Sequence, residues 1–351
     1  MRADASELEL LVRTYLDPSV SIESVRVGLS GEAATVHALD QLRFPNFGPA
    51  QLVARGGSIV YGWRALTFDG TGRVSHADVR VTERSDESWS PPRVVETAPV
   101  RGPGASSMAL VSLNGSVRTV AVEQDRMGLD VRSVDSDAHF RVPVATRIWD
   151  EAGIATLPFG PGSAVVLWHS LDSEGFAVAT AVVVTGTGPV GEPVAVLSQL
   201  SAPASATVHA GGLWVAGFQR DDAVSRSRIR ISRVSLSTLQ PTEADRWFAG
   251  WGGTWPSLLD LVEWRGSLWA IWIAEDTRFG PHPALFALPL DDVPCGIGDA
   301  TAFALLSTMM DWSRREWPNQ ARAAANGDTL WIAVAAGPDA VFDLHRVSSC
   351  P

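Results

Sequence analysis

The stretch Glu263-Trp-Arg-Gly-Ser-Leu-Trp-Ala-Ile-Trp272 combines a short strand, a tight turn that ends in glycine, and a second strand of apolar and aromatic residues. Glycine suits such a turn because hairpin turns require positive backbone dihedrals that residues with a Cβ atom resist. The stretch therefore predicts a β-hairpin that turns at Gly266.

The same pattern occurs five more times along the chain. The copies are Ala54 to Tyr61, Ser112 to Val120, Gly160 to Trp168, His209 to Val215 and Ala325 to Ile332. The aligned glycines are separated by 58, 47, 50, 54 and 61 residues, which is the length of a four-stranded β-propeller blade with variable loops. A solenoid would keep a stricter period.

A second β-rich run follows each hairpin. These runs are Ala77 to Arg84, Leu129 to Val134, Gly175 to Thr185, Arg228 to Leu236, Ala284 to Leu290 and Ala340 to Val347. Many are apolar at nearly every position, which fits sheets that are packed on both faces. The fold class predicted is all-β, a single β-propeller with six blades as the leading count and seven as the alternative.

The N-terminal segment has to be fitted to this count. The last unit supplies only three strands, so we expect the run Thr35 to Gln41 to complete it and close the ring. The domain prediction is an N-terminal extension of uncertain structure over residues 1–34, followed by a β-propeller over residues 35–351. The extension can form a hairpin across Ser30-Gly-Glu32 or a seventh, irregular blade, and only Leu8 to Tyr15 has some helical periodicity.

Composition excludes several classes of function. The net charge is -11 and no basic stripe is present, so no nucleic-acid partner is expected. No apolar run is long enough for a transmembrane segment, and residues 1–20 do not have the pattern of a signal peptide. The oligomeric state is not indicated.

The two cysteines occupy equivalent places in the last two units. Cys295 and Cys350 each follow the third strand of their unit. Equivalent positions of adjacent blades are close in space, so a disulfide is predicted, with two unrelated buried thiols as the alternative. A disulfide would indicate an extracytoplasmic protein, secreted or on the cell surface, whose leader is not present in this chain.

Two motifs occur in and just before the first unit. Arg43-Phe-Pro45 precedes its first hairpin, and Thr82-Glu-Arg-Ser-Asp-Glu-Ser-Trp89 lies between its third and fourth strands. They resemble the Arg-Ile-Pro strand and the Asp-box turn of sialidases, which are six-bladed propellers, over about residues 42–95. The resemblance implies that Arg43 is a substrate-binding arginine, whereas the residues alone also allow a local ion pair at a strand start.

The resemblance leaves the catalytic set incomplete. Arg84 and Asp86 occupy the positions of the Asp-box aspartate and glycine. The tyrosine nucleophile of sialidases comes late in the chain, whereas Tyr15 and Tyr61 are the only tyrosines and both come early. No catalytic residue is therefore predicted, and a non-enzymatic role is favoured over an enzymatic one.

Tryptophan is frequent, with 14 in the chain. Trp264, Trp269, Trp272 and Trp331 lie in or beside strands, so they are expected to fill space between blades. Trp251 and Trp255 lie in the loop Ala249 to Pro256, where they are candidates for stacking on a sugar ring.

Metal and cofactor signatures are weak. The seven histidines have no paired ligand spacing, and no phosphate loop or dinucleotide motif occurs, so no metal site and no cofactor are predicted. Asp69-Gly-Thr-Gly72 and Asp172-Ser-Glu-Gly175 offer oxygens to calcium, but turns explain them better.

The functional hypothesis is a non-catalytic β-propeller that binds or scaffolds, recognising carbohydrate or a protein partner through loops on one face. Trp251, Trp255 and Arg43 are its candidate ligand-binding residues. The alternative is a glycoside hydrolase of the sialidase type.

Overall fold

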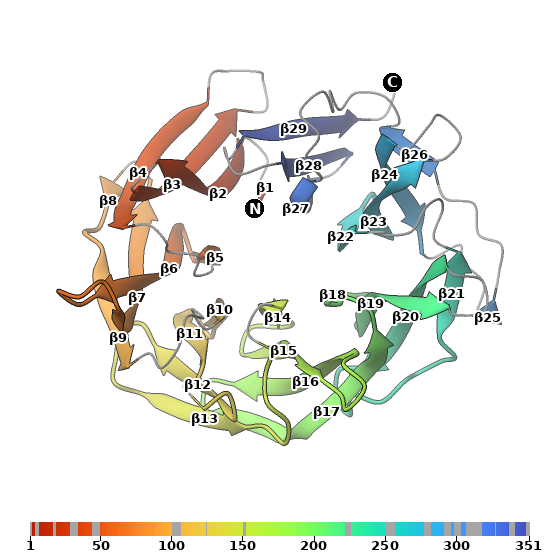
Figure 1. The fold of residues 1–351 in the computed structure, drawn as a ribbon, viewed down its shortest axis with the longest axis horizontal. Helices are drawn as coiled ribbons and strands as arrows, with labels where there is room; N and C mark the ends of the chain where they lie inside the picture. The colour runs from red at the N-terminus through yellow and green to blue at the C-terminus, as the bar shows by residue number, and fades with distance from the viewer. Residues whose placement is uncertain are drawn as a thin grey trace. The chain divides into compact units, whose positions relative to one another are not determined.

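The structure is a computed structural model and is all-β over the residues it describes (Figure 1). These are residues 2–3, 7–16, 19–28, 34–43, 50–86, 88–99, 107–123, 125–149, 152–221, 226–249, 257–276, 282–290, 296–297, 303–306, 318–326, 328–336 and 341–348. Within these ranges no α-helix occurs, and so none that could span a membrane.

The strands form seven sheets, A to G in chain order, and contacts divide the chain into two compact units. Residues 6–171 and 180–194 belong to one unit, and residues 1–5, 172–179 and 195–351 belong to the other. Each unit is described by itself below.

Sheets A to D contain the strands from β1 to β17. Sheet A has the order β1-β2-β3-β4, formed by Arg2–Ala3, Glu7–Leu16, Ser19–Gly28 and Thr35–Arg43. Sheet B contains β5 (Ala50–Arg55), β6 (Ser58–Phe68), β7 (Val74–Ser85), β8 (Ser88–Trp89) and β9 (Arg93–Pro99), and both β8 and β9 pair with β7. Sheet C runs β10-β11-β12-β13, formed by Met108–Leu113, Ser116–Val122, Gly128–Ser133 and His139–Pro143. Sheet D runs β14-β15-β16-β17, formed by Ile154–Pro158, Ser163–Leu171, Ala177–Thr185 and Gly188–Leu200.

Sheets E to G contain the remaining strands. Sheet E has β18 (Ser205–His209), β19 (Gly212–Asp221), β20 (Arg226–Ser235), β21 (Arg246–Ala249) and β25 (Gly296–Ile297), which pairs parallel with β21. Sheet F has β22 (Ser257–Trp264), β23 (Ser267–Asp276), β24 (His282–Pro289) and β26 (Phe303–Leu306). Sheet G has β27 (Pro318–Asn326), β28 (Thr329–Ala336) and β29 (Val341–Ser348).

All six predicted hairpins are present. Each joins the first two strands of one sheet, from B to G, and each predicted second run is the third strand of the same sheet. In sheet C the turn residues Asn114 and Gly115 have φ angles of 52° and 76°, as a two-residue hairpin turn requires. The fold class, all-β with the strand order of a single β-propeller, is confirmed.

Sheet A is the sheet that the seven-bladed alternative requires. β3 and β4 pair antiparallel, and Ser30 to Glu32, where a hairpin turn was predicted, lie outside the described residues. The prediction that Thr35 to Gln41 completes the last blade was wrong, because β4 is the fourth strand of sheet A. The helical periodicity of Leu8 to Tyr15 was misleading too, since these residues lie in β2 and Leu8 and Leu10 are buried.

Successive sheets pack face to face in each unit. In the first unit, one apolar cluster joins sheets A and B, a second joins B and C, and a third joins C and D. In the other unit, clusters join sheets E and F, and F and G. The apolar runs of sheets B, C and F thus pack on both faces of the sheet.

The tryptophans of the strands fill these clusters as predicted. Trp264, Trp272 and Trp331 are buried, and Trp269 packs against the cluster between sheets F and G. A large ring spans the space between two sheets, and its burial contributes roughly 2 to 3 kcal/mol.

Side chains also tie the first strands of neighbouring sheets together. In the first unit, the Gln51 amide accepts a hydrogen bond from the Leu110 N–H (3.0 Å) and donates one to the Ile154 carbonyl (3.3 Å). In the other unit, Asp260 accepts hydrogen bonds from the Ser205 hydroxyl (3.2 Å) and the Ala323 N–H (2.9 Å). Each side chain satisfies backbone or hydroxyl groups at a strand edge that has no further strand.

Candidate functional site

The hairpin between β22 and β23 has an arginine in its turn, one of seven described non-glycine residues with a positive φ angle. Arg265 and Gly266 form a two-residue turn between the paired residues Trp264 and Ser267, and their φ angles are 58° and 75°. Asparagine, aspartate and glycine tolerate this left-handed conformation, whereas an arginine adopts it at a cost. A strained residue held in a turn is a reason to look for function there.

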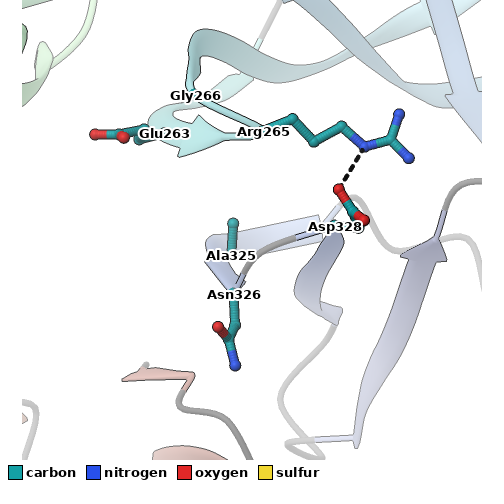
Figure 2. Close-up of a pocket in the computed structure, with 6 residues that line it drawn as sticks. All are labelled: Glu263, Arg265, Gly266, Ala325, Asn326 and Asp328. Atoms are coloured by element: carbon teal, nitrogen blue, oxygen red, sulfur yellow. Dashed lines mark ion pairs between the residues drawn. The ribbon is translucent and has the colours of Figure 1, made fainter.

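A hollow of about 590 Å³ lies at this turn (Figure 2). It is lined by residues of the β22–β23 hairpin and of the β27–β28 hairpin. These residues are Glu263, Arg265, Gly266, Ala325, Asn326 and Asp328. The hollow is open to solvent, and its volume is large enough for one or two sugar rings.

The two hairpins meet through opposite charges. The Nε atom of Arg265 is 3.7 Å from an Asp328 carboxylate oxygen, and Figure 2 shows the arginine stretched toward that carboxylate. The Asp328 side chain is 80 % exposed and that of Glu263 is 58 % exposed. One Glu263 oxygen lies 3.1 Å from the Nδ1 atom of His209, a nearly buried residue at the end of β18.

Two tryptophans, Trp264 and Trp269, pack next to the residues that line the hollow. The indole N–H of Trp264 donates a hydrogen bond to the Asp328 carbonyl (3.1 Å), which holds the second hairpin against the first. The Arg265 guanidinium lies 4.8 Å from the centre of the Trp264 ring, a cation–π contact. Trp269 packs on Trp264 with ring centres 5.0 Å apart and donates its N–H to the Trp264 carbonyl. The polar residues Arg265 and Asp328 are therefore held in place by contacts with Trp264.

The lining is suited to recognition of hydroxyl groups. Two carboxylates accept hydrogen bonds, a guanidinium donates them, and the Asn326 amide does both. None of the six lining residues is a serine, cysteine or tyrosine, but Glu263 and Asp328 are carboxylates, the groups that most glycoside hydrolases use as nucleophile and general acid. Among the residues that the structure describes, no three or more His, Cys, Asp or Glu side chains are grouped to hold a metal ion.

The side chains of the predicted site residues lie outside the part of the chain that the structure describes. Arg43 is the last residue of β4, where it pairs with Ser19, and its side chain lies outside the described residues. Trp251, Trp255, Cys295 and Cys350 also lie outside them, so their predicted roles stay predictions.

The two acidic loops considered for calcium are turns. One oxygen of Asp69 accepts hydrogen bonds from the Thr71 hydroxyl (2.6 Å) and from the N–H groups of Arg73 (3.0 Å) and Thr71 (2.8 Å), and these bonds, that of the hydroxyl first, lower the pKa of Asp69. Asp172 accepts in the same way from the N–H groups of Glu174 and Phe176, both at 2.9 Å. Each carboxylate caps its own loop.

The segment that resembles an Asp box takes part in a buried polar cluster. Arg84 donates hydrogen bonds to Glu9 (2.8 Å) and to the Tyr61 hydroxyl (3.3 Å), and the Tyr61 hydroxyl also bonds to Glu9. Burial, and then the hydrogen bond to Glu9, raises the pKa of Tyr61 to about 12. Burial opposes the charge of Arg84, but Tyr61 and Glu9 raise its pKa. All three side chains are buried, so the cluster joins sheets A and B and is closed to a ligand.

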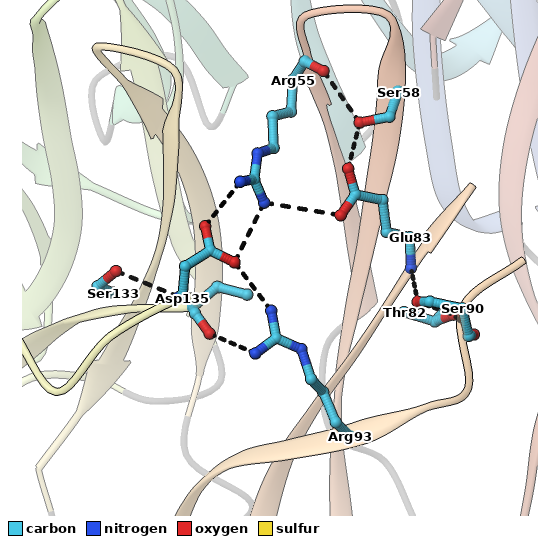
Figure 3. Close-up of polar contacts among 9 residues, drawn as sticks. Arg55, Ser58, Thr82, Glu83, Ser90, Arg93, Ser133 and Asp135 are labelled. Carbon is cyan, nitrogen blue, oxygen red and sulfur yellow. Dashed lines mark hydrogen bonds and ion pairs between the residues drawn. The ribbon is translucent and has the colours of Figure 1, made fainter. Parts of the chain in front are cut away.

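A second polar network joins sheets B and C (Figure 3). Asp135, in the loop after β12, accepts hydrogen bonds from Arg55 (2.9 Å to the nearer oxygen) and from Arg93 (3.0 Å). Glu83 lies 3.6 Å from Arg55 and accepts a hydrogen bond from the Ser58 hydroxyl. Both arginines are thus engaged by acidic residues of the protein itself, which makes the network structural.

The hollow was not predicted from the sequence, although both hairpins that line it were. The available signal was the arginine of Trp264-Arg-Gly266, at a turn position where the equivalent hairpin has Asn114. The acidic residue after Gly327 was a second signal. Neither shows by itself that the two turns meet.

Comparisons with known proteins support the fold. No protein-family model and no curated protein matches the sequence. An α-L-arabinanase of Penicillium chrysogenum, solved with arabinobiose, is 10 % identical with a TM-score of 0.52, over 98 % of each chain. The fungal lectin of Aleuria aurantia, described as a six-bladed β-propeller with a fucose recognition mode, is 13 % identical with a TM-score of 0.46, over 85 % of this chain and 90 % of the lectin. The arabinanase shares the fold of this chain.

Proposed function

We propose that this protein is a non-catalytic carbohydrate-binding β-propeller, and that the hollow between the β22–β23 and β27–β28 hairpins holds the sugar. The observation that carries the proposal is the lining: Glu263, Arg265, Asn326 and Asp328 surround a space of about 590 Å³. Charged and amide side chains of this kind bind neighbouring hydroxyls of a sugar through paired hydrogen bonds.

The strained turn supports the same proposal. Arg265 is held in a conformation that asparagine or glycine would adopt with less strain, which is understandable if the guanidinium is needed in the hollow. The arabinanase that shares the fold is described with a bound disaccharide, but a 10 % identical neighbour supports the fold alone. The proposal therefore depends on the residues of this chain.

A glycan array followed by calorimetry tests the proposal. The intact protein should bind at least one sugar, with the micromolar to millimolar affinity expected of a small open site. Arg265→Asn keeps a residue that favours the turn but removes the guanidinium, and Asn326→Ala removes the amide. Each should weaken binding at least about tenfold, the effect of losing a hydrogen bond to a charged or amide group.

The matched control is Arg141→Asn. Arg141 is an exposed arginine that pairs with Glu123 in sheet C, outside the hollow, so this variant should bind like the parent. The proposal fails if no glycan binds, or if binding survives both changes in the hollow. If glycans are cleaved and new reducing ends appear, the glycoside hydrolase alternative replaces it.

A further inference from the structure

We propose that the hollow selects sugars that carry a free amino group over neutral and acidic sugars. This inference rests on the proposed function and specifies the ligand class of the same site. It follows from how the charges of the lining are already engaged.

The carboxylates outnumber the cations of the hollow. Glu263 and Asp328 are acidic and Arg265 is the single basic residue among the six that line it. Arg265 is also engaged, because Asp328 lies 3.7 Å from its Nε atom and the Trp264 ring lies 4.8 Å from its guanidinium carbon. An acidic sugar would have to compete with Asp328 for this guanidinium and would meet Glu263 as a like charge.

Glu263 is the carboxylate of the hollow that does not pair with Arg265, so it is the one that we expect to bind a cation. Its side chain is 58 % exposed, and its described polar partner is the His209 ring, 3.1 Å from one carboxylate oxygen. Its other oxygen makes no hydrogen bond to a described residue, so a ligand ammonium can approach it. Figure 2 shows Glu263 and Arg265 extending in opposite directions from the hairpin, so the arginine does not cover the glutamate.

The field of the whole chain acts in the same direction. The net charge of -11 attracts cations and repels anions near the surface. This long-range term is screened by salt within about 10 Å at 0.1 M, whereas direct pairing with Glu263 is screened less. A preference that survives salt therefore belongs to the hollow.

The experiment compares matched sugars by calorimetry at pH 6 in 0.15 M salt. For each of the gluco, galacto and manno series, the methyl glycosides of the 2-amino sugar, its N-acetyl form, the neutral sugar and the uronic acid are titrated into the protein. In at least one series the amino sugar should bind about fivefold more tightly than the neutral sugar, the effect of one exposed ion pair. The uronic acid should bind most weakly, and N-acetylation should abolish the gain.

Two variants locate the preference. Glu263→Gln keeps the shape of the side chain and should make the amino and neutral sugars bind equally. Glu192→Gln removes the same charge from an exposed residue of β17, which does not line the hollow, and should leave the preference unchanged.

The outcomes separate the two proposals. If no sugar of any series binds, and the glycan array is also negative, the proposed function is wrong. If sugars bind but amino sugars have no advantage, or if Glu263→Gln keeps that advantage, carbohydrate binding stands and the amino-sugar inference is overturned.

Discussion

At the scale of single residues, buried polar groups contribute to stability in ways that depend on pH. Tyr61 is fully buried between sheets A and B and shares Glu9 with Arg84. Its hydroxyl stays protonated well above the ordinary range for tyrosine, because burial and the neighbouring carboxylate oppose a second negative charge.

The raised pKa of Tyr61 predicts how the stability of the fold changes at alkaline pH. In the unfolded chain Tyr61 loses its proton near pH 10.0, whereas in the folded chain it does so near 12. Between these values the folded state binds more protons, so the stabilisation present below pH 10 is lost as the pH rises to 12. The loss should be on the order of 2 kcal/mol.

Tyrosinate absorbance and urea unfolding at pH 8 to 12 measure it. Tyr61→Phe should remove the late ionisation step and flatten the fall in stability. Ionisation of both Tyr15 and Tyr61 near pH 10 in the folded protein would contradict the prediction.

Replacing the turn residue Arg265 should stabilise the protein. Because asparagine tolerates a φ of 58° better than arginine does, Arg265→Asn should raise the free energy of unfolding by roughly 0.5 to 1 kcal/mol while it weakens ligand binding. Urea unfolding checks this, with Arg141→Asn as the control at an exposed strand residue. A less stable Arg265→Asn protein would mean that the guanidinium holds the hairpins together more strongly than the turn resists it.

At the scale of strands and sheets, glycines set how closely neighbouring sheets approach. Gly217 of β19 stands five residues after Gly212, and a Cβ atom on it would lie 2.7 Å from a Leu200 methyl group. Gly62 of β6 stands in the same place after Gly57 and meets Leu110 at 3.0 Å. Both leucines use the space that a side chain would otherwise fill.

A size exchange tests this contact. Gly217→Val and Leu200→Ala should each cost about 2 to 3 kcal/mol, the first by overpacking and the second by leaving a cavity. The double variant adds and removes the same number of carbon atoms, so it should be at least 1 kcal/mol more stable than the sum of the single effects. Urea denaturation of the four proteins measures the coupling. Gly70→Ala, where no atom lies within 4 Å, is the neutral control, and strict additivity would refute the contact.

The network of Figure 3 predicts a smaller and salt-dependent effect. Asp135→Ala removes the acceptor shared by Arg55 and Arg93, whose side chains are 29 % and 51 % exposed. The loss should be about 1 kcal/mol in low salt and less in 0.5 M salt, because exposed pairs are screened. Thermal unfolding of this variant and of Asp137→Ala, a nearby exposed acid, provides the comparison. Equal losses for both variants, at any salt concentration, would show that the network does not join the sheets.

The sequence predicted the hairpins because their information is local. A glycine turn and its flanking strands are contiguous, so each unit from Ala54 onward could be recognised. β2 could not, because Leu8, Leu11 and Tyr15 fit a helical spacing while Leu8 and Leu10 fit a strand, and its turn to β3 lacks glycine. The hollow could not either, since it combines Glu263 and Asp328, which only folding brings together.

At the scale of the whole molecule, the predicted disulfide is the feature that links the fold to a compartment. If Cys295 and Cys350 pair, the bridge closes a long loop and should contribute on the order of 4 kcal/mol in the chain-entropy model. Mass spectrometry of peptides prepared with and without reductant, from protein recovered from its natural source, should show the linked pair. Two free thiols would remove the argument for an extracytoplasmic location.

Finally, the turn that carries Arg265 is only two residues long, and the strands on both sides keep an unbroken register from the turn to the pair Asp260 and Ile271. The same geometry occurs at Asn114-Gly115 and at Ala210-Gly211. Residues at these tips are consequently exchangeable, because a guanidinium can be moved from one hairpin to another without any insertion or deletion. A scaffold built this way can gain or change ligands by single substitutions at its hairpin ends, while the sheets beneath stay as they are.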